Sequence, residues 1–141
     1  MRMTKLSARL QAVLDALELR PGMRVLEVGC GPGALARAMA EEVSPGGFVL
    51  GIDRSATALA RASAASERRV MPDGLAFRCC AAEDFVRAPD EQPFDVIVAI
   101  RVGAFDGRHP ELEAIARRRM AAALRPGGRF IVDGVLQALD A

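Results

Sequence analysis

Residues 25–33 constrain the fold more than any other stretch of the chain, and they read Val-Leu-Glu-Val-Gly-Cys-Gly-Pro-Gly. A mainly apolar run that is too short for a helix meets alternating glycines, and an Ala-rich segment follows directly. This order predicts a strand, a tight turn and the start of a helix. Gly29 and Gly31 have no Cβ and can take positive φ, so a ligand can lie on the backbone where the first helical N–H groups point outward. In an open α/β sheet, nucleotide-like ligands bind at such a turn.

Predicted helices and strands alternate along the rest of the chain. We expect helices at 4–19, 33–43, 55–69 and 110–124, and strands at 24–28, 48–52, 75–80, 94–100 and after the turn at 126–128. This alternation is typical of a doubly wound α/β fold with a mainly parallel sheet. The chain has 141 residues, of which 51% are hydrophobic, enough for one domain with a substantial core. We therefore expect a single domain over residues 1–141, with an N-terminal helix within 1–20 and an α/β core at 24–133.

Two acidic side chains indicate which ligand the turn accepts. Glu27 lies two residues before Gly29, where its carboxylate would repel a pyrophosphate in a partly desolvated loop, so a cationic ligand fits better. Asp53 lies 20 residues beyond Gly33, at the carboxyl end of the second strand, where an acid can accept hydrogen bonds from both ribose hydroxyls. Asp53 could instead cap the next helix, although Ser55 is equally able to do so.

Three motifs together resemble the class I S-adenosylmethionine-dependent methyltransferases. They are the E-x-G-x-G-x-G pattern at 27–33, the Phe-Asp-Val-Ile-Val run at 94–98 and the L-x-P-G-G element at 124–128. The resemblance covers about 19–132 and implies a Rossmann-like fold with strand order 3-2-1-4-5 and S-adenosyl-L-methionine as cofactor. It implies that Glu27 organises the turn and the methionine ammonium, and that Asp53 holds the ribose. The other implied cofactor-binding residues are Gly29, Cys30, Gly31, Gly33, Arg54, Ala82 and Glu83.

The sequence departs from the family pattern at two places. The position that usually holds an acid for the adenine amino group is Ala81, so Glu83 or Asp84 substitutes, or backbone groups near Ala82 read the adenine alone; both acids could equally cap a short helix. Only 133–141 follow the fifth strand, so we expect the family's last two strands to be missing and the fifth strand to be an open edge. The chain is then a fragment, a minimal domain, or a protomer of a homo-oligomer that pairs through this edge.

The loop after the fourth strand supplies the candidates for the acceptor side. Arg101 could anchor a carboxylate or phosphate, and His109 could act as a base or simply begin the next helix. Asp106 and Arg108 could pair with each other. The loop lacks the Asn/Asp-Pro-Pro-Tyr signature that resembles amino-group methylation of bases or glutamine. With 19 basic and 18 acidic residues, the charge is balanced. We therefore expect a small-molecule acceptor, no membrane partner and no nucleic acid.

Two other functions are compatible with these patterns. An NAD(P)-dependent oxidoreductase also has a strand, a glycine turn and a distal acid, and Arg54 could bind a 2′-phosphate, but the third glycine comes one residue too early for Gly-x-Gly-x-x-Gly. A cofactor-binding subunit or fragment without catalysis would account for the short carboxyl end. The three cysteines and single histidine lack metal-ligand spacing, so we expect no metal site and a reducing cytoplasm.

Overall fold

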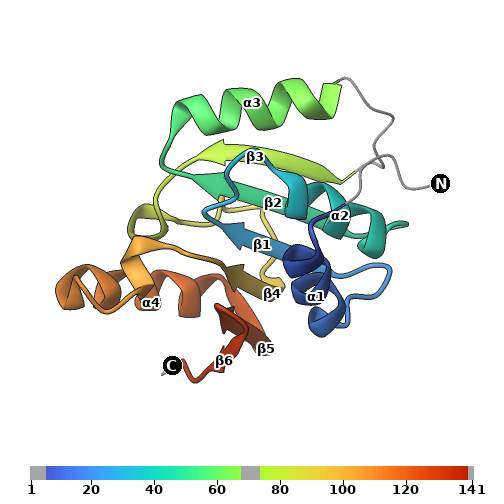
Figure 1. Ribbon diagram of the computed structural model, residues 1–141. Coiled ribbons are helices and arrows are strands. Elements are labelled where there is room, and N and C mark those ends of the chain that lie inside the picture. The colour runs from blue at the N-terminus through green and yellow to red at the C-terminus, as the bar shows by residue number, and fades with distance from the viewer. Residues whose placement is uncertain (1–5, 68–73, 140–141) are drawn as a thin grey trace.

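A six-stranded sheet forms the centre of the protein (Figure 1). The computed structural model describes residues 6–67 and 74–139. The strands follow the order β3-β2-β1-β4-β5-β6. Their bounds are β1 Arg24–Val28, β2 Phe48–Asp53, β3 Leu75–Cys79, β4 Phe94–Ala99, β5 Leu124–Val132 and β6 Val135–Gln137. The predicted order 3-2-1-4-5 is confirmed.

β1 lies at the middle of the sheet, between two parallel neighbours. Leu26 pairs with Leu50 of β2 on one side and with Ile97 of β4 on the other. All but Arg24 of β1 is buried, because helices cover both faces of a parallel sheet. The chain leaves β1 towards β2 and later returns on the opposite side as β4, so the sheet has its topological switch point between β1 and β4.

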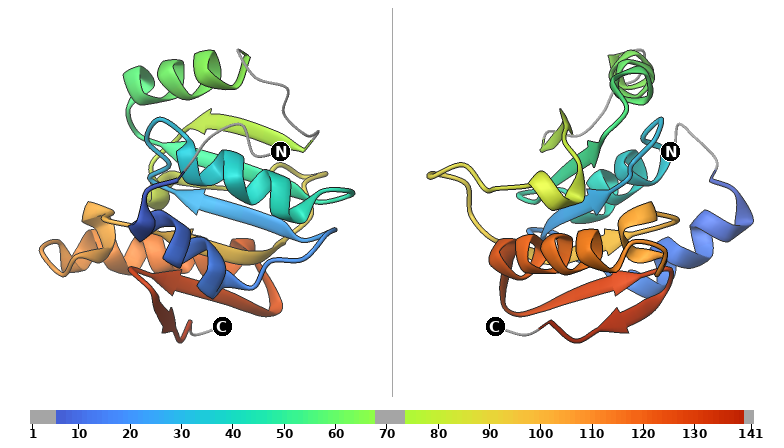
Figure 2. Two further views of the ribbon diagram at one scale, coloured as in Figure 1. Left: turned by 45° about the vertical axis from the view of Figure 1, so that its right-hand side comes forward. Right: turned by 90° about the vertical axis from the view of Figure 1, so that its left-hand side faces the viewer.

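Helices cover both faces of the sheet, as a doubly wound fold requires (Figure 2). α2 Ala34–Val43 and α3 Ala56–Glu67 lie on one face together with α1, and α4 Pro110–Ala123 lies on the other. Two short 3₁₀ helices, η1 Ala82–Asp84 and η2 Gly103–Phe105, lie on the side of α4. α1 spans Ala8–Leu17: the Ser7 hydroxyl caps its first turn and Glu18 ends it in the left-handed conformation, while residues 4 and 5 of the predicted helix lie outside the described residues.

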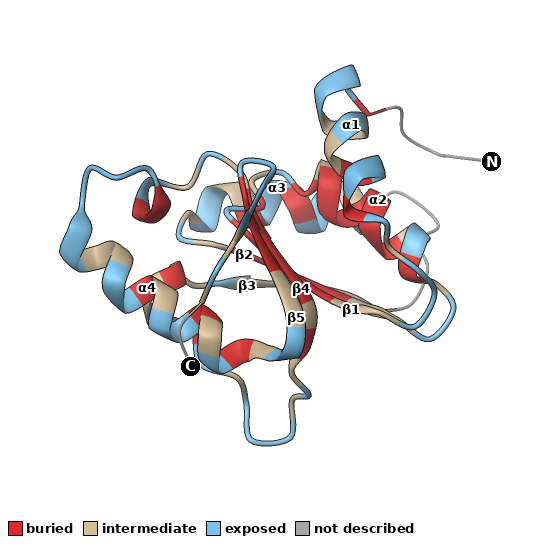
Figure 3. Ribbon diagram, turned by 90° about the horizontal axis from the view of Figure 1, so that it is seen from below, coloured by how far each residue is buried: buried red, intermediate tan, exposed pale blue. Residues whose placement is uncertain are grey.

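Each face of the sheet has its own hydrophobic core. One core joins Leu26, Phe94 and Phe130 to Met120 of α4, and the other packs Val25 of β1 against α1 and α2. Figure 3 shows α2 buried along most of its length, while α4 exposes its outer side. Seven of the ten α2 residues are buried, and Ala at three of these positions lets the helix lie close to the sheet.

The carboxyl-terminal part of the sheet differs from the prediction in two ways. The turn at 126–128 does not precede β5 but interrupts it: Leu124 pairs with Phe94, and pairing resumes only between Arg129 and Val96. After β5 the chain reverses and adds β6, which pairs antiparallel with the last residues of β5. The expectation that both final strands are missing and that β5 is an open edge was therefore wrong for 130–132, where the three residues of β6 cover it.

The amino ends of the strands are joined by a network around Asp95. Its Oδ2 accepts the backbone N–H of Arg24 at 2.8 Å, and its Oδ1 lies 2.6 Å from the Arg125 guanidinium. The Arg24 guanidinium lies over the rings of Phe48 and Phe94, 4.8 and 5.3 Å from their centroids. These contacts of Asp95 therefore join β1, β4 and β5 at this end of the sheet.

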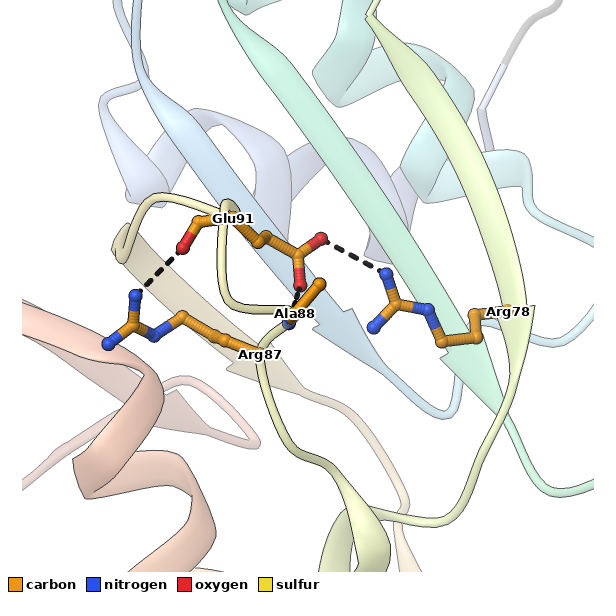
Figure 4. Close-up of polar contacts among 4 residues, drawn as sticks. All are labelled: Arg78, Arg87, Ala88 and Glu91. Atoms are coloured by element: carbon orange, nitrogen blue, oxygen red, sulfur yellow. Dashed lines mark hydrogen bonds and ion pairs between the residues drawn. The ribbon is translucent and has the colours of Figure 1, made fainter.

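A second polar cluster holds the loop that leads into β4 (Figure 4). Glu91 Oε2 lies 3.0 Å from the Arg78 guanidinium of β3, and Oε1 accepts the Ala88 N–H at 3.1 Å. Arg87 donates to the Glu91 carbonyl at 2.8 Å. These contacts fix the loop against β3 without reaching the carboxyl ends of the strands. Within the described ranges, no helix combines the length and hydropathy needed to cross a bilayer.

Candidate functional site

A cleft of about 190 Å³ opens where the carboxyl ends of β1, β2 and β4 meet. Its walls are the end of β1, the end of β2, the segment through η1 and the loop after β4. Among the residues predicted to bind cofactor, Gly29, Asp53, Arg54, Ala82 and Glu83 line this cleft. It lies at the topological switch point, where open α/β sheets bind ligands.

The glycine turn, residues 29–33, connects β1 to α2; its Gly29 lines the cleft, whereas Cys30, Gly31 and Gly33 are not part of that lining. Its first two N–H groups donate to the Ile52 carbonyl, which fixes the turn to the end of β2. Gly31 has φ of +53° and nothing within 4 Å of the position of a Cβ, so its backbone faces open space. At Gly33, with φ of +86°, a Cβ would lie 2.9 Å from both the Arg37 guanidinium and the Phe77 ring. The first of these glycines therefore leaves room for a ligand, and the second permits close packing.

Asp53 connects the cleft to the turn. Its Oδ2 accepts the Gly31 N–H at 2.9 Å, and its Oδ1 accepts the Ser55 N–H at 2.8 Å. The Ser55 hydroxyl caps α3 by accepting the Ala58 N–H at 3.1 Å. Asp53 is therefore not needed as the side-chain cap of α3. A carboxylate has about four acceptor positions, so Asp53 can receive further donors from the cleft.

Glu27 lies beneath the turn and does not line the cleft. Its side chain is 4% exposed, and Oε1 has no hydrogen-bond partner among the described residues. Burial is the main cause that raises the pKa of Glu27 to about 8, and the nearby Asp53 carboxylate adds to it. A backbone hydrogen bond from Ala36 and the charge of Arg37 act in the opposite direction. The turn thus covers an acid that lacks a full complement of donors.

Arg37 is a site residue that sequence reasoning missed. It lies in α2, is 7% exposed, and its guanidinium donates to the Pro32 carbonyl at 2.8 Å and to the Ala62 carbonyl of α3 at 3.5 Å. It therefore ties the turn to two helices. The available signal was a single arginine within the otherwise small and apolar inward face of 34–40, four residues after Gly33.

Phe77 of β3 is a second missed residue, and it packs against two glycines. Its ring fills the space that a Cβ would need at Gly33, and a Cβ on Gly51 of β2 would lie 2.9 Å from the same ring. The Cys30 sulfur, 3.0 Å from that Gly51 position, fills the other side. Burial, and then the Glu27 carboxylate, raise the pKa of the Cys30 thiol to about 12, so Cys30 is a packed neutral group.

The η1 segment distinguishes the two acids proposed near the adenine. Glu83 is half-buried and lines the cleft, whereas Asp84 is exposed and lies outside the cleft lining. Neither side chain caps η1, whose N-cap is Ala81. The Glu83 carbonyl accepts the Arg119 Nε–H at 3.2 Å, which fixes the segment to α4. The geometry thus favours Glu83 over Asp84, and its role at the adenine stays a prediction.

The structure separates the two predicted acceptor-side residues. Arg101 lines the cleft in the left-handed conformation, with φ of 55°, and its N–H donates to Asp133 Oδ1 at 2.8 Å. His109 is exposed and lies outside that lining; it precedes α4 and borders a separate hollow together with Leu112. Leu112 lines both the hollow and the cleft. The predicted pair of Asp106 and Arg108 is confirmed at 2.6 Å.

Arg54 is the remaining charged residue that lines the cleft. Arg54 is exposed at the end of β2, and no partner of its guanidinium is found among the described residues. Its carbonyl lies 3.7 Å from the Cys79 sulfur, which is consistent with a reduced thiol. In the described part of the chain, no group of three or more His, Cys, Asp or Glu side chains could hold a metal ion.

Residues 19–140 match a family described as "Methyltransferase domain". Nocamycin O-methyltransferase from Saccharothrix syringae is 38% identical over 122 residues, which are 86% of this chain and 41% of that protein. Protein-L-isoaspartate O-methyltransferase from Methylorubrum populi is 38% identical over 120 residues, 85% of this chain and 49% of that protein. The chain thus spans less than half the length of these two relatives.

A solved structure with a bound ligand has the same fold. A SAM-dependent methyltransferase from Geobacter sulfurreducens in complex with S-adenosyl-L-homocysteine superimposes with a TM-score of 0.68. The two are 26% identical, and the match covers 90% of this chain and 47% of that one.

Proposed function

The chain belongs to the class I S-adenosylmethionine-dependent methyltransferases, and from this premise we propose that it transfers a methyl group to a small-molecule acceptor bound beside the cleft. The observation that carries the proposal is the cleft itself, where the bare backbone of the glycine turn, the Asp53 carboxylate and Arg101 meet at the switch point of the sheet.

The residues present fit S-adenosylmethionine better than a phosphorylated nucleotide. The unpartnered Glu27 oxygen lies beneath the turn, where it can act as an acceptor for a positively charged donor group, whereas a diphosphate offers it no donor. Asp53 would hold the ribose, and the open space over Gly31 would admit the ligand against the backbone. When bound, S-adenosylmethionine supplies a methyl group on a positively charged sulfur that is already a good leaving group.

The protein's own contribution is then mainly to position the acceptor. Holding a nucleophile in line behind the methyl carbon can supply much of the rate without a catalytic dyad. Arg101 is the anchor that we assign to the acceptor, because it lines the cleft and, within the described chain, its guanidinium has no ion-pair partner. His109 would reach an acceptor only from the neighbouring hollow, so we assign it the lesser role of a base for acceptors that extend over Leu112.

The acceptor class rests on the relatives and on charge. Nocamycin O-methyltransferase and protein-L-isoaspartate O-methyltransferase are both named for transfer to oxygen. With balanced charge and a cleft of about 190 Å³, we infer an oxygen nucleophile on a small molecule rather than on nucleic acid. A methylation screen of a metabolite extract with methyl-labelled cofactor tests this, and labelling of protein or RNA alone would refute it.

A ligand titration tests the cofactor assignment. Calorimetry with S-adenosylhomocysteine, NADH and NADPH should give binding of the first only. For variants of the acidic site residues, Asp90→Asn in the exposed loop before β4 is the control. Its neighbour Glu91 is not used because it fixes that loop. Binding of NADPH without S-adenosylhomocysteine would favour the oxidoreductase.

A second candidate is a cofactor-binding protein without catalysis of its own. This alternative predicts S-adenosylhomocysteine binding but no transfer to any extract. Association through the part of the β5 edge that β6 does not cover, residues 124–129, is a separate prediction, and sedimentation at increasing protein concentration tests it.

A further inference from the structure

Glu27 is surrounded by groups that do not neutralise it. Its neighbours in the sheet register are Gly51 on β2 and Val98 on β4, neither of which has a charge. The thiol of Cys30 in the turn is neutral and packs in the same region. Among the charged groups that act on Glu27, Asp53 is repulsive and Arg37 is attractive. The carboxyl therefore lies in a dry space where a negative charge is poorly supported.

Arg37 lowers the pKa of Glu27 only in part against the effect of burial, and its Nη1 group also donates to the backbone. Its guanidinium binds the Pro32 carbonyl of the turn and the Ala62 carbonyl of α3. A Cβ on Gly33 would come within 2.9 Å of it, so the guanidinium lies directly against the turn. This arrangement fixes the turn over Glu27 and leaves one Glu27 oxygen without a donor among the described residues.

We propose that Glu27 holds a proton in the ligand-free protein and releases it to solvent when the cationic end of the cofactor binds at the turn, with Arg37 as the residue that positions the turn above it. The inference rests on the proposed cofactor site. The proton balance is as follows: the O–H bond of Glu27 breaks, the proton passes to buffer, and the carboxylate that remains interacts electrostatically with the ammonium bound on the turn above it. The desolvation that disfavours the charge in the free protein is offset by the new partner.

The ligand-free half of the proposal is tested by stability against pH. The folded-state pKa of Glu27, about 8, lies above its ordinary value of 4.5, so the unfolded chain loses the proton first as the pH rises. Stability should therefore fall with pH between these values and level off above them. Relative to Glu27→Gln, the unfolding equilibrium constant of the wild type should rise by up to about tenfold per pH unit in that window.

Denaturant titrations of the wild type, Glu27→Gln and the control Asp90→Asn at pH 5, 6, 7 and 8 measure this ratio. A ratio for Glu27→Gln that grows with pH, with no such trend for Asp90→Asn, supports a protonated Glu27. A ratio that stays constant across the window overturns the proposal without any reference to ligand.

The binding half is tested by counting protons. Calorimetry of S-adenosylhomocysteine at pH 6.5 in buffers of different ionisation enthalpy gives the number released per ligand, and we expect roughly one for the wild type and none for Glu27→Gln. Binding with no buffer dependence, or with the same dependence in Glu27→Gln, overturns the proton release and leaves the proposed function standing. No binding of S-adenosylhomocysteine at all refutes the proposed function and this inference together.

The role of Arg37 is tested by Arg37→Met, Arg37→Lys and the exposed control Arg118→Met. Loss of the positive charge should disfavour ionised Glu27, so Arg37→Met should release fewer protons and bind S-adenosylhomocysteine at least about tenfold more weakly. Arg37→Lys should restore the proton count, and it provides the measurement if the Met variant does not fold. A weaker affinity with an unchanged proton count in both variants would overturn the assignment, because that is the result of a purely structural role.

Discussion

Asp53 and Asp95 are aspartates of the same sheet, but they lie at its opposite ends and are held in different ways. Asp95, at the amino ends of the strands, binds the Arg125 guanidinium and the Arg24 N–H. Asp53, at the carboxyl ends, accepts two backbone N–H groups within the described part of the chain, and its charge disfavours ionisation of the neighbouring Glu27. One end pairs its negative charge with a cation inside the chain, and the other leaves that cation to be supplied by a ligand.

The two ends of the sheet also differ in the groups that surround their charged side chains. The amino end has cation partners and aromatic rings around Arg24, and the cleft is absent there. The carboxyl end has the cleft, the non-glycine Arg101 in the left-handed region and an acid with an unpartnered oxygen, while at the amino end Arg24 Nε also lacks a hydrogen-bond partner among the described residues. A strained residue and an unpaired acid beside a cleft mark a candidate functional site. Changes at the amino end should therefore affect folding, and changes at the carboxyl end should affect binding.

The largest effect is expected for Gly33→Ala, which tests whether the glycine turn at the carboxyl end is tightly packed. Gly107→Ala is the matched control, because Gly107 has the same φ of +86° but nothing within 4 Å of a Cβ. Positive φ alone should cost about 1–2 kcal/mol in both. Contact with Arg37 and Phe77 should raise the loss for Gly33→Ala to about 2–4 kcal/mol and abolish S-adenosylhomocysteine binding. Denaturant unfolding and calorimetry measure both; equal losses would show that the turn is not crowded.

The next effect tests the amino end. Asp95→Ala should lower the free energy of unfolding by about 1.5–3 kcal/mol, because a charged acceptor of two hydrogen bonds is lost and Arg125 keeps no partner there. Partial exposure of the pair places the result in the lower half of that range. Affinity for S-adenosylhomocysteine should not change. A comparable loss of affinity at temperatures where the variant is fully folded would break the division between the two ends.

Asp53→Ala provides the reciprocal test at the carboxyl end. We expect S-adenosylhomocysteine to bind about 1–3 kcal/mol more weakly, since charge-assisted hydrogen bonds to the ribose are lost. The stability should change less than in Asp95→Ala, because Asp53 accepts backbone N–H groups and its removal leaves no guanidinium without its ion-pair partner. Calorimetry and unfolding on the same samples compare the two; unchanged affinity would remove Asp53 from the site.

The smallest effect is expected for Arg101→Gly, which separates an acceptor role from a cofactor role within the cleft. Arg101→Gly relieves the left-handed strain at φ of 55°, so it should raise stability by up to about 1 kcal/mol, less the entropy that glycine adds to the unfolded chain. It should leave S-adenosylhomocysteine affinity unchanged and lower the rate of methyl transfer, since the acceptor anchor is lost. Arg118→Gly in the helix α4 should instead destabilise the protein. A loss of cofactor affinity in Arg101→Gly would assign the residue to the cofactor.

The sequence was sufficient to predict the parts of the fold that depend on short-range pattern. The strand, glycine turn and helix at 24–43 and the strand order 3-2-1-4-5 follow from apolar runs, turn residues and the family motifs, and the structure confirms them. β6 was not predicted, because three residues of which two are exposed carry no periodic signal. The interruption inside β5 was placed before the strand, because a Pro-Gly-Gly run gives no information on whether pairing precedes it.

The sequence predicted the site residues whose type alone suggests a function. It did not predict those whose function depends on packing. Asp53 and Arg101 were expected at the carboxyl ends of their strands and line the cleft there. Arg37 was not recognised, because only the three-dimensional structure shows that its position on α2 faces the turn. The separation of His109 from the cleft also depends on the path of the loop through η2, which spacing does not determine.

The ring of Phe77, which lies against both Gly33 and Gly51, makes three positions in three different elements depend on one another. A larger residue at either glycine fits only if position 77 shrinks at the same time, and a smaller residue at 77 opens a void behind the turn. In a deep alignment of related chains we therefore expect positions 33, 51 and 77 to vary together, with small side chains at 77 accompanying alanine or serine at the other two.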